Sequence, residues 1–98
     1  MDSISTVLKQ ARESKGLLLR EVGAAVNIDT SMVSKYEKGE RLPSPKQVIS
    51  FAQFYEMDKD YLLTLLLSDR ILQDIEASPY AMQALQWAWE KLQNRKKR

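Results

Sequence analysis

Apolar residues recur at helical spacing along the first half of the chain. A first helix is predicted over residues 4–14, where four positions follow the i, i+3, i+4, i+7 rule: Ile4, Val7, Leu8 and Ala11. A second, short helix ends at Asn27 and carries three apolar positions on one face: Leu19, Val22 and Val26. Asp29 is placed to cap a third helix that ends at Gly39. About four residues join the second and third helices, the spacing of a helix-turn-helix.

The same pattern predicts four more helices downstream. Ser44 and Pro45 form a cap followed by proline at the first helical position, which starts a fourth helix. Asp58 caps a fifth helix to about Leu67, Asp69 starts a short sixth, and Ser78–Pro79 starts a long seventh that reaches about Asn94. No strand-like alternation of useful length occurs. The sequence therefore predicts an all-α protein, and 98 residues suffice for one core but not two.

The last predicted helix has an unusually wide apolar face. With 100° per residue, its apolar side chains cover a sector of about 220°, whereas a surface helix shows a stripe of a little over 100°. Two neighbours are therefore expected: either the fifth and sixth helices of the same chain cover both flanks, or a second copy covers one. Tryptophan is enriched at interfaces, which favours a homodimer. The expected interface residues are Ile71, Leu72, Ile75, Leu85, Trp87, Trp89 and Leu92.

Composition and charge exclude several classes of function. The chain has no Cys and no His, so it lacks disulfides, thiolate metal ligands and the commonest general base, and no cofactor or metal is expected. Of its 15 Lys and Arg residues, four end the chain at positions 95–98. This leaves 11 against 13 acidic residues in positions 1–94, a net charge of −2 there. Binding to nucleic acid would thus require a local cationic patch.

The start and the apolar runs bear on location. The first ten residues, MDSISTVLKQ, lack the pattern of a signal peptide, and the longest apolar run, residues 61–67, is far shorter than a membrane span. The chain is expected to be cytoplasmic, with no membrane partner.

From Leu8 to Leu62 the order of residues resembles the phage-repressor type of helix-turn-helix domain, the Cro and XRE kind. The resemblance rests on Arg12, Gly16, the apolar positions of the second and third helices, and the run YEKGERLPS at residues 36–44. It implies a five-helix, lambda-repressor-like DNA-binding domain over residues 1–67. Residues 68–94 would then form a C-terminal helical dimerisation extension, and residues 95–98 a basic tail that is either a solvated end or a phosphate-contacting arm.

The resemblance also implies roles for individual residues. In this fold the third helix lies in the major groove, so its outward side chains would contact base edges: Thr30, Ser31, Ser34 and Lys35. The residues that follow would contact phosphates: Lys38, Arg41, Ser44 and Lys46. Arg12 and Glu37 would form a buried, structural salt bridge.

Two positions depart from the family pattern. The second helix usually begins with Ser or Thr as its cap, followed by a Gln that contacts phosphate, but this chain has Leu18 and Leu19. Glu56 stands where a Gly commonly ends the fourth helix, which predicts a strained turn. The first departure removes a usual DNA anchor and exposes apolar surface beside it.

The function expected is a sequence-specific double-stranded DNA-binding transcriptional regulator, a repressor acting as a homodimer on a palindromic operator, with no small-molecule ligand. A restriction-modification controller protein and a DNA-binding antitoxin share the fold and remain alternatives, and a protein–protein adaptor is a third. Ser31 and Lys35 lie one helical turn apart and imitate a Ser-Lys dyad, but an exposed convex helix offers no pocket for catalysis. No enzyme activity is expected.

Overall fold

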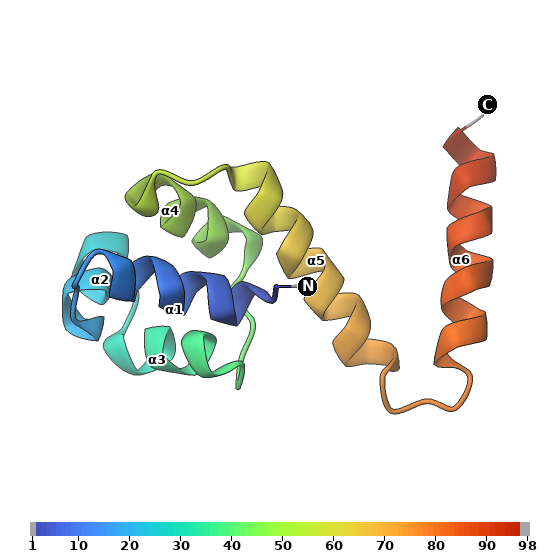
Figure 1. Cartoon of the computed structure of the whole chain (residues 1–98), viewed down its shortest axis with the longest axis horizontal. Coiled ribbons are helices and arrows are strands. Elements are labelled where there is room, and N and C mark those ends of the chain that lie inside the picture. Colours follow the sequence, from blue (N-terminus) through green and yellow to red (C-terminus); the bar gives the residue numbers. More distant parts are fainter. Residues whose placement is uncertain (1, 97–98) are drawn as a thin grey trace.

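The computed structural model of the chain describes residues 2–96, which form helices joined by turns without any strand. The helices are α1 (Ile4–Ser14), α2 (Leu19–Val26), α3 (Thr30–Lys38), α4 (Pro45–Tyr55), α5 (Lys59–Ile75) and α6 (Ala81–Lys96). The first five pack together, whereas α6 stands apart beyond the far end of α5 (Figure 1). The predicted all-α fold is confirmed.

One face of each of the first five helices forms the core. The buried apolar side chains are Ile4, Val7, Leu8, Val22, Val33, Tyr36, Val48, Phe51, Ala52, Tyr55, Leu62, Leu65 and Leu66. Phe51 lies at its centre, edge-on to Tyr36 at 6.4 Å and stacked on Tyr55 at 6.2 Å between ring centroids. Of the positions that the apolar spacing predicts for α1 and α2, four are buried, Ile4, Val7, Leu8 and Val22, and three are only partly buried against this core, Ala11, Leu19 and Val26. No residue from 67 to 96 is buried, so the core ends at Leu66.

The predicted break between a fifth and a sixth helix is wrong. Residues 59–75 form the single helix α5, because neither Gly nor Pro interrupts this segment. Asp69 does not cap its own helix: its Oδ2 accepts a hydrogen bond of 2.7 Å from the backbone N–H of Ile4. A carboxylate is favourable at the positive end of a helix, so the far half of α5 holds the start of α1.

Two non-glycine residues end helices in the left-handed conformation. Asn27 ends α2 with φ of 58°, and Glu56 ends α4 with φ of 56°. The turn after α4 closes as a glycine turn would, with the N–H of Met57 donating to Ala52 O at 2.8 Å. A side chain in this conformation costs roughly 1 kcal/mol relative to glycine, so the strain expected at Glu56 is present.

The last helix leaves its apolar side chains in solvent. Trp87 and Trp89 of α6 are 57% and 58% exposed, and Leu92 is 52% exposed. Leu72 on the far half of α5 is similarly open, at 54%. The alternative in which the chain's own helices cover both flanks of α6 is therefore not observed within residues 2–96. Over the same residues, no helix has the length and hydropathy needed to span a membrane.

Candidate nucleic-acid interface

Gly23 sets the close crossing of α2 and α3. A β-carbon at this position would lie only 2.7 Å from the backbone oxygen of Ile28 and 3.3 Å from Oγ1 of Thr30. Backbone oxygen cannot move aside as a flexible side chain can, so a larger residue would push the two helices apart. The angle at which α3 projects thus depends on this glycine.

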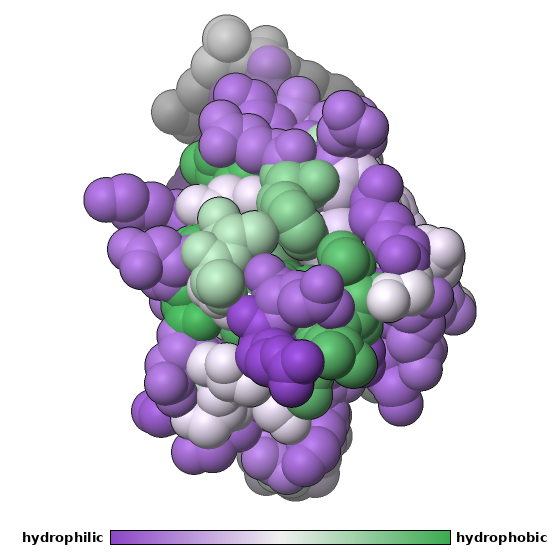
Figure 2. Space-filling model, turned by 90° about the vertical axis from the view of Figure 1, so that its left-hand side faces the viewer, coloured by the Kyte–Doolittle hydropathy of each residue, from purple (hydrophilic) through white to green (hydrophobic). Residues whose placement is uncertain are grey.

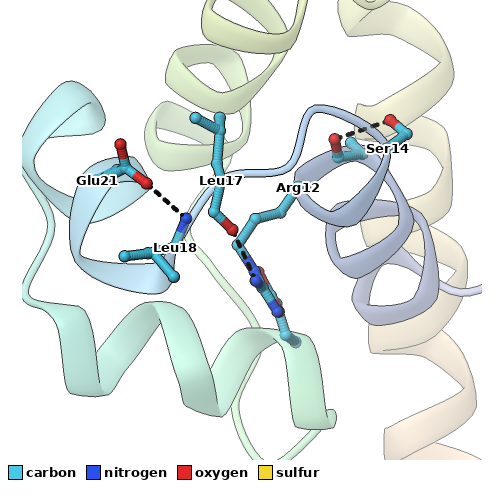
Figure 3. Close-up of polar contacts among 7 residues, drawn as sticks. Arg12, Ser14, Leu17, Leu18 and Glu21 are labelled. Atoms are coloured by element: carbon cyan, nitrogen blue, oxygen red, sulfur yellow. Dashed lines mark hydrogen bonds and ion pairs between the residues drawn. The ribbon is translucent and has the colours of Figure 1, made fainter.

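An ion pair joins α1 to the end of α3. Nε of Arg12 donates to both carboxylate oxygens of Glu37, at 2.9 and 3.1 Å, and Nη2 donates to Oε1 at 3.0 Å. Nη1 donates to the backbone oxygen of Leu17 at 2.9 Å, so the same guanidinium also holds the turn before α2 (Figure 3). The Glu37 side chain is only 5% exposed. Its hydrogen bonds raise the pKa of Arg12, and the pair is part of the scaffold rather than of the exposed face.

Gln47 fixes the segment between α3 and α4. Its Oε1 accepts hydrogen bonds from the hydroxyl of Tyr36 at 2.7 Å and from the N–H of Ser44 at 3.0 Å. Its own N–H donates to Oγ of Ser44 at 3.1 Å, which completes the cap of α4. The segment that carries Lys38 and Arg41 is therefore held at both ends.

The start of α3 presents the residues predicted to contact bases. Thr30, Ser31 and Lys35 are exposed, and Ser34 is half-buried. Asp29 precedes the helix but does not cap it: its carboxylate accepts a hydrogen bond from the hydroxyl of Ser31 instead. Thr30 Oγ1 lies over Gly23 at the crossing with α2. Lys35 is therefore the freest of the four side chains, because the Ser31 hydroxyl donates its proton to Asp29.

The residues predicted to contact phosphates lie around this face. Lys38, Arg41, Ser44 and Lys46 are all exposed. Within residues 2–96, neither Lys38 nor Arg41 nor Lys46 takes part in an ion pair. The Ser44 hydroxyl oxygen accepts from Gln47, which leaves its proton free to donate to an anion. The arrangement presents these three cations beside a helix start that carries hydroxyl groups and the Asp29 carboxylate.

Sequence reasoning missed Arg20. This residue lies on the first turn of α2 and lines an open hollow with the start of α3: Arg20, Gly23, Ala24, Asn27, Ile28, Asp29 and Thr30. The signal was available, because Arg20 follows Leu19 directly, the position where the family places its phosphate contact. A guanidinium is a group that can donate two parallel hydrogen bonds to a phosphate.

The departure at Leu18 leaves α2 without a side-chain cap and exposes apolar surface. Leu18 precedes α2 without a side-chain cap, although Glu21 Oε1 accepts a hydrogen bond of 2.8 Å from its N–H (Figure 3). The side chain is 49% exposed. Figure 2 looks onto the end of the molecule where α2 lies and shows apolar side chains gathered in the middle of this face among polar ones.

The residues predicted to make a dimer lie on the far half of α5 and on α6. Ile71, Leu72, Leu85, Trp87, Trp89 and Leu92 are exposed and Ile75 is half-buried. Between the two helices lies a mainly apolar groove lined by Thr64, Leu67, Ser68, Ile71, Leu72, Ile75 and Leu85. Of the predicted basic tail, Arg95 and Lys96 end α6, and residues 97–98 lie outside the described residues.

Both the sequence and the fold of this chain are similar to those of known proteins. The sequence model of a protein family described as "Helix-turn-helix" matches residues 8–62. The HTH-type transcriptional regulator ImmR of Bacillus subtilis (strain 168) is 31% identical over 61 residues, which cover 62% of this chain and 48% of ImmR. This chain thus aligns with about half the length of that relative. A solved chain from a SinR protein/SinI protein complex has a similar fold, with a TM-score of 0.58 and 19% identity over 97% of this chain and 99% of that one.

Proposed function

The chain belongs to the helix-turn-helix family of Cro/XRE-type transcriptional regulators, and from this premise we propose that it is a repressor that binds double-stranded DNA sequence-specifically, as a homodimer on a near-palindromic operator. Repression follows when the bound dimer occludes a promoter. The same DNA-binding chemistry serves a restriction-modification controller or an antitoxin, which differ in the gene they regulate.

The observation that carries the proposal is the exposed start of α3 on a rigid support. Ser31 and Lys35 are exposed on a helix whose last turn is fixed twice, through the ion pair of Glu37 and the hydrogen bond from Tyr36 to Gln47. Lysine prefers the O6 and N7 acceptors of guanine, and a serine hydroxyl donates or accepts. Lys38 and Arg41 follow as phosphate contacts. The local cationic patch that an otherwise acidic body needs for DNA binding is thus available.

The homodimer is proposed from the extension. One head reads only a few base pairs, so specificity in a genome requires two half-sites about 34 Å apart, related by a two-fold axis. We assign residues 1–67 to DNA binding, 68–94 to dimerisation and 95–98 to a basic tail. Because α5 runs across the first boundary and Asp69 holds α1, residues 68–75 belong to the folded head as well as to the proposed dimerisation surface.

DNA binding is tested by anisotropy of labelled duplexes selected from a random library. We expect affinity to fall steeply as salt rises, and Arg41→Ala to make that dependence shallower. Lys59→Ala is the matched control, because Lys59 is an exposed cation at the start of α5 (Figure 1). A protein that selects no sequence and binds no duplex at low salt would instead be an adaptor, the alternative favoured by the exposed Leu18 and tryptophans.

The dimer is tested by sedimentation of the full chain and of a chain cut after Ile75. The full chain should be dimeric at tens of micromolar, and the cut chain should be a folded monomer that binds its half-site weakly. Trp89→Glu in the full chain should shift the mass toward the monomer, because it places a charge in the apolar sector. A dimeric cut chain would place the interface in the head.

A further inference from the structure

Small and large side chains alternate along one line of α6. Ala81, Leu85, Ala88 and Leu92 follow each other at spacings of four, three and four residues, the repeat of a helix–helix seam. We call these four residues the α6 seam. Leu85 and Leu92 are 44% and 52% exposed, and none of the four is buried by the chain itself. A seam with this spacing is complete only when a second helix lies along it.

We propose that the second helix is α6 of another copy of this chain, antiparallel to the first, with Ala81 opposite Leu92 of the partner subunit and Leu85 opposite Ala88 of the partner subunit. This inference rests on the homodimer proposed above and specifies its geometry. Each large seam residue then meets a small one, so the two backbones approach closely without leaving a void.

Charge favours the antiparallel direction over the parallel one. Toward its end α6 carries three cations, Lys91, Arg95 and Lys96, against one carboxylate, Glu90, whereas Asp74 and Glu76 lie at the other end of the hairpin, where α5 turns toward α6. Parallel helices would bring the cationic ends of both copies together. In the antiparallel register, Arg95 and Lys96 extend past the start of the partner's α6, toward the turn that carries its acidic residues. Opposite charges therefore meet at both ends of the pair.

The groove between α5 and α6 explains the width of the apolar sector. Leu85 reaches this groove from α6, and Ile71 and Leu72 line it from α5. A partner helix that follows the seam passes the mouth of the groove and contacts both helices. By symmetry each α6 has two neighbours outside its own chain, α6 and α5 of the partner, which is what a sector of about 220° requires.

Spin labels distinguish the direction, and the absence of native cysteine makes single-cysteine labelling clean. Gln83 and Asn94 are exposed and lie on the same side of α6, three turns apart. In the antiparallel register, the two labels at Gln83→Cys are offset by about 10 Å along the axis and those at Asn94→Cys by about 22 Å. Double electron–electron resonance should therefore give the longer distance for Asn94→Cys.

Equal distances at both sites would mean parallel helices and would overturn the geometry while leaving the homodimer intact. A monomer by sedimentation would overturn this inference and the proposed homodimer, but not DNA binding by the head. The labels are on the outward side of α6, so they leave the seam unchanged.

A size swap tests the register. Ala88→Leu alone places a leucine against Leu85 of the partner subunit, twice in each dimer because of the two-fold symmetry. The dissociation constant of the dimer should therefore rise at least about tenfold. Leu85→Ala together with Ala88→Leu restores a large residue opposite a small one and should recover most of the affinity, although each single variant is weaker. Equal affinity of the double variant and Ala88→Leu would refute this pairing. Far-UV circular dichroism of each variant checks that the head remains folded.

Discussion

Replacing Arg12 by alanine should destabilise the head even without DNA. The substitution removes three hydrogen bonds to Glu37 and one to Leu17 O, and it leaves a carboxylate that is 5% exposed without its cation. Breaking a buried pair in this way costs about 3–5 kcal/mol. The total free energy of unfolding of a small domain is about 5–15 kcal/mol, so the melting temperature should fall by well over 10 °C.

The assay should be urea unfolding followed by far-UV circular dichroism. Tryptophan fluorescence is unsuitable, because Trp87 and Trp89 both lie on α6 outside the core. Arg20→Ala is the matched control, since it removes an exposed arginine and should change the free energy of unfolding by less than about 0.5 kcal/mol.

A double variant separates the cost of an unpaired buried charge from the contribution of the ion pair itself. Replacing Arg12 and Glu37 together by Met and Leu removes the stranded charge, so the double variant should recover most of the stability that Arg12→Ala loses. The free energy of unfolding is obtained by extrapolation to zero urea, which carries an error of about 1 kcal/mol. If the value for Arg12→Ala lies within this error of the wild-type value, the pair contributes little to stability and the reasoning fails.

Four further substitutions test other parts of the structure. Lys35→Ala should lose roughly 1–3 kcal/mol of binding free energy on the selected operator and relax the preference for one base. Arg41→Ala should instead weaken binding to all DNA sequences alike. Identical binding profiles of the two variants across an operator library would contradict this difference in role. Gly23→Ala should cost about 1–3 kcal/mol in urea unfolding, because its β-carbon meets Ile28 O at 2.7 Å. Burial raises the pKa of Tyr55 from 10.0 to about 12, so this tyrosine stabilises the fold below pH 10 and that contribution is lost as pH rises through 12. Tyr55→Phe should abolish this loss without lowering stability at pH 7, since the hydroxyl has no hydrogen-bond partner within residues 2–96; an unchanged alkaline transition in Tyr55→Phe would show that another group causes it.

Most of the fold could be predicted because its signals are local. Ser3, Ser44 and Asp58 each accept a hydrogen bond from the first turn of the helix they precede, and such contacts span only two or three residues. Asp69 shows where this reasoning fails. It has the side chain of a helix cap, but its partner, Ile4, is 65 residues away. A sequence pattern identifies a capping residue without identifying which helix it caps.

The candidate interface was predictable to the level of its exposed face. The spacing of Val33 and Tyr36 fixes the buried side of α3, and so the opposite side must face outward. The spacing could not reveal that Asp29 bonds to Ser31 instead of capping the helix, because both arrangements use the same residues. Hydrogen bonds among neighbouring exposed side chains depend on rotamers, which periodicity does not determine.

The position of α6 is the part that a single chain cannot explain. Sixteen residues are close to the length at which an isolated helix is only marginally stable in water, and α6 buries none of its side chains against the head. Each large apolar side chain that a partner covers contributes about 1.5–3 kcal/mol, so contact through Leu85, Trp89 and Leu92 would stabilise the helix as well as the dimer. Folding of α6 and association are then one equilibrium. Helical signal should consequently fall on dilution together with the dimer, and a signal that stays constant while the dimer dissociates would show that α6 is stable alone.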